Sequence, residues 1–413
     1  MSKIFIKTFG CTLNKKDSKN IVANYNYSED EKDTFTADYI IINTCGVKER
    51  TDTKIINYLK KLKQLNISEK KIIICGCLVT IDKELLTDIF PNANYFKIEE
   101  TKQLQKLLGS LKLETKTKKV NISEPIILSN GCLGNCNYCA VKFARGKLKS
   151  KSEKDIILEI EKTIENGSKE ILLTSQDNGC YGFDINTNIV KLLSEIIKIK
   201  GNFLIRLGMA NPQHLKIFKK ELIEIYKHEK LYKFLHIPIQ SGDNQVLKDM
   251  NRFYNIEDVF DIIKEFRKEI PEITIATDII VGYPTESEEE FQNTIEVIKK
   301  LKPDVVNISR FGQRKRIEAN KHKDLLGAIK KKRSRELTIL CRKISLNNNK
   351  LFLNTEKEVL VTEVGKNNTV MARTVEYKPV GIKGNYPIGT KLKVKIINYK
   401  ANFLIGKNSL EKM

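Results

Sequence analysis

Two groups of three cysteines are the residues of this chain whose type and spacing point most directly to chemistry. Cys132, Cys136 and Cys139 form a C-x3-C-x2-C pattern just after an expected strand, where barrel enzymes carry their reactive residues. Structural zinc sites take four ligands, often as two CxxC pairs, whereas three thiolates suit a [4Fe–4S] cluster with one iron left open. The pattern predicts an iron–sulfur cluster, with zinc or structural thiols as the alternatives.

The second group consists of Cys11, Cys45 and Cys77, and each follows an expected strand directly. In a parallel sheet such positions converge at the carboxyl edge, where open α/β sheets bind ligands. Three thiolates meeting there would again leave one iron open. The alternative is a set of buried structural cysteines, which are common in cores. The total of nine cysteines is odd, and no signal peptide precedes them, so a disulfide framework does not fit.

The elements that must position these cysteines alternate between strands and helices. We expect strands at 3–9, 38–44 and 70–76, with helices after each, the first running through the stretch from Cys11. Apolar strands between helices indicate a doubly wound parallel sheet in an N-terminal domain, residues 1–110. Residues 111–123 lack apolar periodicity and are expected to be a linker.

Residues 124–350 continue the alternation with six strand–helix units, which predict a closed or partly closed parallel barrel. A basic helix is expected at about 324–349, before a domain at 351–413 in which short alternating strands predict a small β-barrel. The six expected core strands are 125–130, 170–175, 203–208, 234–240, 273–282 and 304–311.

The charge of the chain predicts a polyanionic partner. The 413 residues include 73 Lys or Arg and 51 Asp or Glu, a formal charge of +22. Between Arg310 and Lys350, 14 Lys or Arg face three acids, so half of the net charge lies in a tenth of the chain. RNA or DNA is the first candidate partner. Composition excludes a disordered chain, and no apolar run approaches a membrane span, so we expect an intracellular, cytoplasmic protein.

The C-x3-C-x2-C spacing within a series of six strand–helix units resembles the radical S-adenosylmethionine (SAM) superfamily. The order GC…NTC…GC, then C-x3-C-x2-C, then a small β-barrel resembles the methylthiotransferase family, whose C-terminal barrel is called TRAM. The resemblance covers essentially the whole chain. It implies a partial (β/α)6 radical SAM barrel and two [4Fe–4S] clusters. The SAM-binding cluster would be held by Cys132, Cys136 and Cys139, and the sulfur-carrying cluster by Cys11, Cys45 and Cys77. Two SAM molecules would be used per turnover. Cys75, Cys180 and Cys341 are expected to be bystanders.

Several stretches resemble the archaeal and eukaryotic branch of that family, which acts on N6-threonylcarbamoyladenosine (t6A) in tRNA. They include GCLGNCNYCAVKFARG, EILLTSQDNGCYG and FLHIPIQSGDNQVLKDM. This resemblance implies conversion of t6A at position 37, next to the anticodon, to its 2-methylthio derivative. Adenine C2–H is unreactive toward ordinary acid–base chemistry, so a radical cofactor is required. The alternatives are isopentenyladenosine, a ribosomal-protein side chain, or a non-catalytic RNA-binding iron–sulfur protein.

The resemblance also suggests where ligands bind. His236 is expected to be a satisfied core histidine, and Arg145 and Gly146 to close the cluster loop. Residues expected to contact SAM or the modified base end the barrel strands or adjoin the third cysteine: Tyr138, Gln176, Asp177, Arg206, Gln240, Ser241, Asp278 and Gly282.

For RNA we expect basic contacts from the 310–350 segment and from the small barrel. In the first of these, the sequence GQRKRIEAN replaces the Pro-Gly-Thr turn usual in the family, and its charges would face either phosphate or solvent. Tyr377 and Phe403 would stack on bases or pack in the core. We also expect a one-electron reductant, such as a ferredoxin or flavodoxin, as a partner. We expect the protein to be a monomer. The expected RNA contacts are Arg314, Lys315, Arg316, Lys331, Lys332, Arg333, Arg373 and Lys378.

Overall fold

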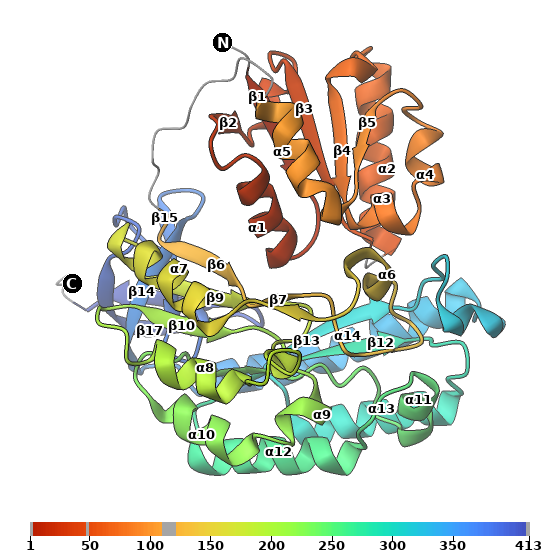
Figure 1. The fold of residues 1–413 in the computed structure, drawn as a ribbon. Coiled ribbons are helices and arrows are strands. Elements are labelled where there is room, and N and C mark those ends of the chain that lie inside the picture. The colour runs from red at the N-terminus through yellow and green to blue at the C-terminus, as the bar shows by residue number, and fades with distance from the viewer. Residues whose placement is uncertain (1–2, 47–48, 110–120, 410–413) are drawn as a thin grey trace. The chain divides into compact units, whose positions relative to one another are not determined.

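The computed structural model describes residues 3–46, 49–109 and 121–409, which form two compact units (Figure 1). Unit 1 comprises Met1–Lys119 together with Asn130–Lys149 and Gly312–Lys321. Unit 2 comprises Val120–Ser129, Ser150–Phe311 and His322–Met413. Both cysteine groups therefore belong to unit 1. The small barrel and the core barrel share unit 2. No described helix is long and apolar enough to cross a membrane.

The described part of unit 1 contains a parallel sheet of five strands in the order β2-β1-β3-β4-β5. This is a doubly wound order, and the chain direction across the sheet reverses between β1 and β3. The apolar strand β4 and all of β3 except Tyr39 are buried because helices cover both faces of the sheet. The strands are β1 (Ile4–Thr8), β2 (Tyr27–Ser28), β3 (Tyr39–Thr44), β4 (Ile72–Gly76) and β5 (Asn94–Phe96).

Two apolar layers flank this sheet. Helices α2, α3 and α4 pack on one face around Ile40, Ile42 and Ile74, and α1 and α5 pack on the other around Ile41 and Ile73. The alternation of these isoleucines along each strand decides which layer each one enters. The helices are α1 (Thr12–Ile21), α2 (Glu49–Gln64), α3 (Cys77–Ile81), α4 (Glu84–Thr87), α5 (Thr101–Gly109) and, within Asn130–Lys149, α6 (Val141–Arg145).

The core of unit 2 is a partial parallel barrel built from two three-stranded sheets, β6-β9-β10 and β11-β12-β13. The bridge between Ile205 and Leu231 joins the two sheets, so the six strands follow one another in chain order. The strands are β6 (Ser123–Ile127), β9 (Glu170–Thr174), β10 (Leu204–Leu207), β11 (Phe234–His236), β12 (Thr274–Val281) and β13 (Val305–Arg310), with the short pair β7 (Ser129–Asn130) and β8 (Lys149–Ser150) beside the cysteine loop.

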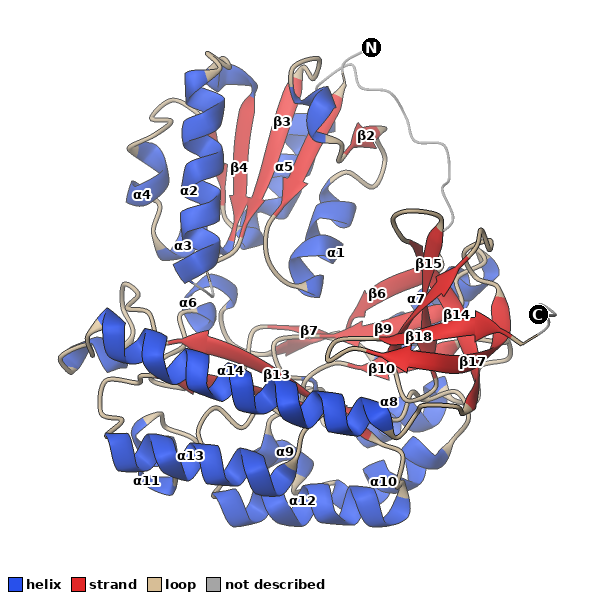
Figure 2. Cartoon of the chain, turned by 180° about the vertical axis from the view of Figure 1, so that it is seen from behind, coloured by secondary structure: helices blue, strands red, loops and turns tan. Residues whose placement is uncertain are grey.

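Helices surround the barrel and bury one large apolar core between helices and strands. Their starts carry sequence signals: Ser152, Asn255 and Ser287 each accept a hydrogen bond from a backbone N–H of the first turn. The longest helix, α14, packs against β13 (Figure 2). The helices are α7 (Glu153–Glu165), α8 (Ile189–Ile196), α9 (Pro212–Leu215), α10 (Lys219–Lys227), α11 (Asn244–Asp249), α12 (Ile256–Glu269), α13 (Glu288–Leu301) and α14 (Gly327–Lys350).

A closed barrel of five described strands, in the order β14-β15-β16-β18-β17, follows α14. Its interior is filled by alternating apolar residues such as Val359, Val361 and Val394. Five strands this short close on themselves and leave no free sheet edge. They are β14 (Glu356–Val364), β15 (Thr369–Thr374), β16 (Pro379–Lys383), β17 (Lys391–Tyr399) and β18 (Leu404–Asn408).

These elements confirm the expected fold class and each of the expected strands. The additions include β2, β5, β8 and α5, which the sequence analysis did not predict. Most of the expected linker 111–123 lies outside the described residues. The strand β11 ends at His236, four residues before the expected end, because Pro238 cannot donate a ladder hydrogen bond and Gln240 has a left-handed φ of 73°.

Candidate functional site

Cys11, Cys45 and Cys77 lie at the carboxyl edge of three neighbouring strands, β1, β3 and β4. The sheet therefore brings them together as expected. Cys45 and Cys77 are buried and Cys11 is exposed. Two glycines allow the close approach. Gly10 has a φ of 112°, and a Cβ there would lie 2.8 Å from Cys45 Sγ, while Gly76 has a φ of 100° and would meet the Thr44 carbonyl oxygen at 2.3 Å.

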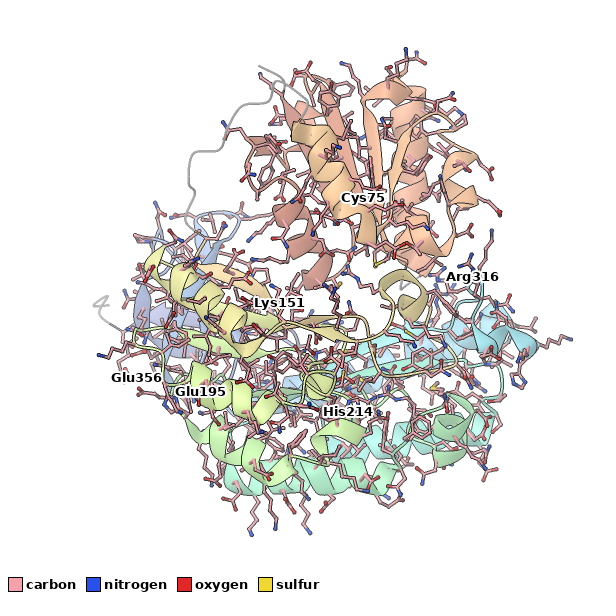
Figure 3. The ribbon with its side chains drawn as sticks, viewed as in Figure 1. Cys75, Lys151, Glu195, His214, Arg316 and Glu356 are labelled. Carbon is pink, nitrogen blue, oxygen red and sulfur yellow. The ribbon has the colours of Figure 1, made fainter. Side chains whose placement is uncertain are left out.

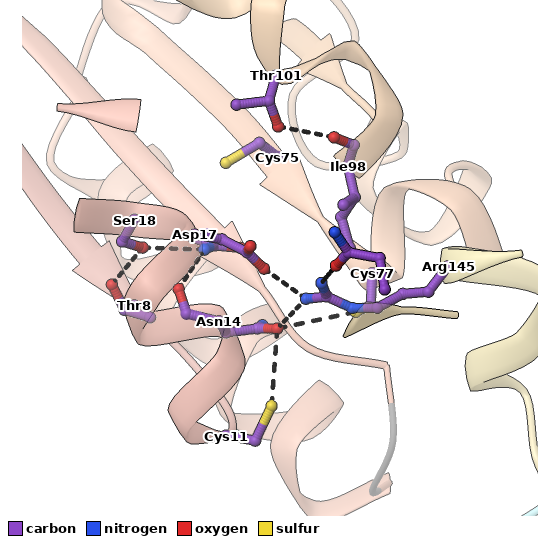
Figure 4. Close-up of polar contacts among 12 residues, drawn as sticks. Thr8, Cys11, Asn14, Asp17, Ser18, Cys75, Cys77, Ile98, Thr101 and Arg145 are labelled. Carbon is purple, nitrogen blue, oxygen red and sulfur yellow. Dashed lines mark hydrogen bonds and ion pairs between the residues drawn. The ribbon is translucent and has the colours of Figure 1, made fainter. Parts of the chain in front are cut away.

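Asn14, fully buried on α1, ties the three cysteine loops to one another (Figure 4). Its Nδ2 donates to the carbonyl oxygens of Phe9 and Thr44, each at 2.9 Å. Its Oδ1 accepts from the Sγ atoms of Cys11 and Cys77, each at 3.9 Å. One amide thus contacts the segments before Cys11 and Cys45 and the thiol of Cys77.

Burial raises the pKa of the Cys77 thiol, and the Arg145 guanidinium opposes that rise. A free thiol here is neutral near pH 7, so the thiolate forms when a cation or metal compensates its charge. The same reasoning holds for the second triad. Burial and the neighbouring Cys136 raise the pKa of Cys139 to about 11.

Cys132, Cys136 and Cys139 lie in the loop between β7 and α6, within unit 1. The backbone N–H of Gly134 donates to Cys132 Sγ at 3.2 Å, and the N–H of Cys139 donates to the carbonyl of Cys136 at 3.0 Å. At the base of the loop, a Cβ on Gly131 would meet the Lys147 carbonyl oxygen at 2.0 Å. The base of the loop is therefore tightly closed, and a Cβ on Gly134 would lie 3.4 Å from Cys132 Sγ and 3.7 Å from Cys136 Sγ, so these two thiols lie near each other.

Both triads fit a cluster better than a single ion. Among the described residues, the group of three whose ligand atoms all lie within 4.8 Å of one another is Asp177, Cys180 and His214, and neither cysteine triad meets that spacing. A cube of four irons is wider than one ion, so thiolates arranged around it stand further apart. Amide donors aimed at sulfur, as at Gly134, also suit thiolate ligands of iron–sulfur clusters.

In unit 2, Gln176 and Ser175 follow β9 at the carboxyl end of the barrel. Gln176 Oε1 and Ser175 Oγ are buried and have no hydrogen-bond partner among the described residues. Burying a hydrogen-bond acceptor without a donor lowers the stability of the fold. A ligand that donates a hydrogen bond to the acceptor removes this loss of stability. These two unpaired acceptors would suit a ligand with an amino group, such as SAM, and the contact expected of Gln176 stays a prediction.

Unlike Gln176, Asp177 forms hydrogen bonds with other residues of the chain through both of its carboxylate oxygens. Its Oδ1 accepts from the backbone N–H groups of Gly179 and Asn211, each at 3.0 Å, and its Oδ2 lies 2.9 Å from His214 Nδ1. The residue is 3% exposed. The expectation that Asp177 contacts SAM is therefore wrong, since its carboxylate joins the loops after β9 and β10.

A polar chain crosses three neighbouring strands on the inner face of the barrel. His236 Nε2 lies 2.9 Å from Asp278 Oδ2, and Asn307 Nδ2 donates to Asp278 Oδ1 at 2.8 Å. His236 is thus a satisfied histidine, as expected. The sequence analysis missed Asn307, which pairs in register with Asp278. The expected strand 304–311 contains Asn307, but only the strand pairing in the structure shows that its partner is Asp278.

Two further expected ligand contacts, at Ser241 and Gly282, differ, whereas the contact expected of Gln240 stays a prediction. Ser241 is fully buried, and its Oγ accepts from the N–H of Asp243 at 3.2 Å, which corrects its expected role. Gly282 has a φ of 72°, and a Cβ there would meet Lys330 Cγ at 2.3 Å, so the glycine makes room for Lys330 rather than for a cofactor. Gln240 is 8% exposed, and its backbone pairs with Asp278 and Ile280.

Arg206 and Tyr377 meet inside unit 2. Arg206 Cζ lies 5.7 Å from the centre of the Tyr377 ring, which also contacts Tyr232 and Phe234 with centroid distances of 4.7 and 4.9 Å. Tyr377 therefore packs the small barrel onto the core, and the packing alternative for this residue is confirmed. Arg206 Nε has no hydrogen-bond partner among the described residues, and the expected contact of Arg206 with SAM or the modified base stays a prediction.

The chain is similar throughout its length to named proteins. A probable threonylcarbamoyladenosine tRNA methylthiotransferase of Archaeoglobus fulgidus is 42% identical, with 99% of each chain covered. One of Pyrococcus abyssi is 37% identical, covering 98% of this chain and 99% of that one, and the Xenopus laevis protein is 32% identical, covering 98% and 76%. The chain belongs to the threonylcarbamoyladenosine tRNA methylthiotransferase family.

Three family models match successive segments of this methylthiotransferase family member. They are the uncharacterized protein family UPF0004 at residues 3–97, the radical SAM superfamily at 126–298 and the TRAM domain at 350–408. A solved radical SAM methyltransferase of Kitasatospora setae, with cobalamin and a [4Fe–4S] cluster bound, has a TM-score of 0.56 at 12% identity, covering 77% of each chain. At that identity the likeness supports the fold alone. The family resemblance drawn from the cysteine pattern is confirmed.

Of the three remaining cysteines of this methylthiotransferase family member, Cys75 and Cys341 lie in apolar cores, as expected of bystanders, whereas Cys180 lies beside Asp177 and His214. Cys75 belongs to the layer under α1 and α5, and Cys341 packs between α14 and the core barrel. Cys180 is fully buried, and its thiol donates to the Asp177 carbonyl oxygen at 3.3 Å. Figure 3 shows Cys75 within unit 1 and His214 within unit 2.

The expected RNA contacts separate into buried and exposed side chains. Arg333 pairs with Glu286 and Lys378 with Asp304, each at 2.7 Å, with arginine and lysine side chains only 5% and 6% exposed. Neither is available to phosphate, so these two expectations are wrong. Lys331, Lys332 and Arg316 are exposed.

The GQRKRIEAN segment is partly neutralised within unit 1. Arg314 pairs with Asp52, and Lys315 pairs with Asp82 at 2.9 Å and with Glu84 at 2.5 Å. Arg316 extends from this segment with a left-handed φ of 69°. The ion pairs explain two of its three basic residues without RNA. Arg373, whose guanidinium lies 5.0 Å from the Tyr377 ring centre, and the half-buried Tyr138 stay predictions.

Proposed function

We propose that this protein converts N6-threonylcarbamoyladenosine at position 37 of tRNA, next to the anticodon, to its 2-methylthio derivative. The observation that carries the proposal is the pair of three-cysteine sites in one unit of a chain that matches the Archaeoglobus relative from end to end. One site alone would suit many radical SAM proteins. Two sites suit an enzyme that generates a radical and also delivers sulfur.

We assign a different cluster to each cysteine triad. Cys132, Cys136 and Cys139 would hold the cluster that binds SAM, and a second [4Fe–4S] cluster would be held by the N-terminal triad, Cys11, Cys45 and Cys77. When bound, these groups supply a 5′-deoxyadenosyl radical and the methylthio sulfur, with two SAM molecules and an external one-electron reductant per turnover. Burial raises the pKa of the Cys77 and Cys139 thiols, so these two start largely protonated and release protons when a cluster is loaded.

The barrel would bind and orient the organic groups. Gln176 accepts a hydrogen bond from the SAM amino group, and the Asp278 carboxylate, held by His236 and Asn307, faces the barrel interior with a fixed orientation. Tyr138, Arg206 and Gln240 complete the proposed set.

The exposed face of α14 would bind the tRNA backbone. Buried and exposed residues alternate along this helix with its 3.6-residue period, so Leu337 and Ile344 face the core. The opposite face carries a basic stripe: Lys331, Lys332, Arg335, Arg342 and Lys343. Such a stripe binds phosphates without reading sequence, which leaves base recognition to the barrel. We propose a cytoplasmic monomer with functional domains at 1–110, 124–350 and 351–413.

The test is an anaerobic reaction of the reconstituted protein with SAM, dithionite, a sulfur source and tRNA carrying t6A, read by mass spectrometry of nucleosides. We expect 2-methylthio-t6A, and none with Cys77→Ala. Cys75→Ala, two residues away in the apolar layer, is the matched control and should retain activity. Product on tRNA carrying isopentenyladenosine instead would overturn the substrate assignment; a relative named for dimethylallyladenosine is also 32% identical.

A further inference from the structure

Arg145 reaches from the loop of one cysteine triad into the site of the other. It ends α6, six residues after Cys139, and its side chain is 2% exposed. Its Nη2 lies 2.5 Å from Asp17 Oδ2 and 2.8 Å from Asn14 Oδ1 (Figure 4). Both partners belong to α1, which begins directly after Cys11. All of these residues lie in unit 1.

The contact with Asn14 brings the guanidinium to the N-terminal thiols. Asn14 Oδ1 accepts from Arg145 and also from the thiols of Cys11 and Cys77. One oxygen atom is therefore shared by a cation and by two of the three expected cluster ligands. Asp17 holds the guanidinium from the other side and fixes its orientation, since a carboxylate accepts a well-aligned guanidinium N–H.

Three thiolates and an iron–sulfur cluster would carry net negative charge into a largely buried place. Burying such a charge without a partner is costly. A cation already held next to the ligands lowers that cost, and it needs no rearrangement when the cluster binds. The described geometry supplies this cation from a chain segment that follows the other triad directly.

We propose that Arg145 is a positioning residue for the N-terminal cysteine site: its guanidinium orients Asn14 between Cys11 and Cys77 and compensates the charge of the cluster bound there. This inference rests on the proposed second cluster. It also links the two sites within the chain, because Arg145 ends the short helix that follows the loop carrying Cys132, Cys136 and Cys139.

Two effects should follow from removing the guanidinium. Partners of metal ligands typically contribute 10–100-fold to metal affinity, so Arg145→Gln should weaken cluster retention at the N-terminal site by roughly tenfold or more. Loss of a neighbouring positive charge also disfavours addition of an electron, so the midpoint potential of that cluster should become more negative.

The experiment uses the full chain with Cys132, Cys136 and Cys139 all changed to Ala, so that iron reports the N-terminal site alone. Iron and sulfide content, followed during titration with a chelator, measures retention, and a redox titration monitored by electron paramagnetic resonance measures the potential. If the parent triple variant binds no cluster, the proposed second cluster fails and with it the premise. If the parent binds a cluster, the Arg145 variants test the inference itself.

Arg145→Lys keeps the charge and separates electrostatics from packing. We expect it to recover the potential and part of the retention that Arg145→Gln loses. Lys142→Gln removes a cation from the same helix whose amine contacts Asn135 in the loop, and it should change neither quantity. Unchanged retention and potential in Arg145→Gln would overturn the proposal, as would equal losses in the Gln and Lys variants, which would indicate packing alone.

Discussion

Arg333 Nη1 lies 2.7 Å from Glu286 Oε2, and the two side chains are almost completely buried. The same guanidinium contacts the Glu286 carbonyl oxygen at 3.0 Å, and Glu286 Oε2 accepts from the backbone N–H of Gly282 at 2.6 Å. This network fastens α14 to the loop after β12. Neighbouring basic residues of α14 therefore differ in role: Arg333 forms a buried ion pair, whereas the adjacent Lys332 is exposed to solvent.

We predict that Arg333→Met destabilises the protein by about 3–5 kcal/mol, because it leaves the Glu286 carboxylate buried without its cation. Urea unfolding followed by circular dichroism measures the effect. Lys332→Gln is the matched control, and its free energy of unfolding should change by less than about 0.5 kcal/mol. That control should instead weaken tRNA binding and reduce the salt-dependence slope by about 1. If Arg333→Met unfolds with the same free energy as the parent protein but binds tRNA more weakly, the assignment of Arg333 to stability and Lys332 to tRNA binding is contradicted.

Asn14→Asp should disrupt the N-terminal cysteine site even before any cluster binds. The carboxylate cannot donate to the carbonyl oxygens of Phe9 and Thr44, and leaving buried acceptors unpaired costs about 1–3 kcal/mol. Thermal unfolding of the apoprotein measures the loss. Asn20→Asp makes the same change at an exposed position of α1 and should have little effect. Equal stabilities of the two variants would show that Asn14 does not hold the loops.

Gly282→Ala should lower stability by about 1–3 kcal/mol, since the added methyl group meets the Lys330 side chain at a backbone φ of 72°. Lys330 cannot easily move away because its amine is held by Asp324 at 2.7 Å and by the Phe311 carbonyl at 3.2 Å. Gly327→Ala is the control: nothing lies within 4 Å of its Cβ position at the start of α14. We expect that variant to be neutral or more stable, and the opposite order would contradict the account.

Tyr377→Ala should separate the small barrel from the core barrel. The ring packs between Tyr232 and Phe234 of the core, and removing a buried aromatic ring costs about 3–5 kcal/mol. Calorimetry should then show two transitions where the parent shows one for unit 2. Tyr377→Phe keeps the ring contacts and should behave like the parent. A single, unshifted transition in Tyr377→Ala would mean that this contact does not join the two barrels.

The sequence predicts the site residues that are fixed by strand order. Cys11, Cys45 and Cys77 each follow a strand within three residues, and neighbouring parallel strands end at one edge of a sheet, so their convergence follows from the pattern alone. The C-x3-C-x2-C loop is equally local. The small barrel follows from the alternation and turn residues of its five strands.

Roles that depend on long-range packing could not be predicted. Arg333 and Lys332 are adjacent in a run of cations, and only the rotation of α14 against β13 decides that the first is buried. Asp177 lies three residues after the end of β9, and two backbone N–H groups and His214, 37 residues later in the chain, occupy its oxygens. The contact of Arg145 with Asp17 spans 128 residues, and no local pattern encodes it.

The most direct test of the central claim is mass spectrometry of nucleosides from total tRNA of cells with and without the gene. The account predicts that 2-methylthio-t6A disappears and t6A accumulates on deletion, and that the native gene restores the modified nucleoside while a Cys132→Ala version does not. If 2-methylthio-t6A persists at its normal level in the deletion strain, with no second enzyme of this family present, the proposed function is contradicted.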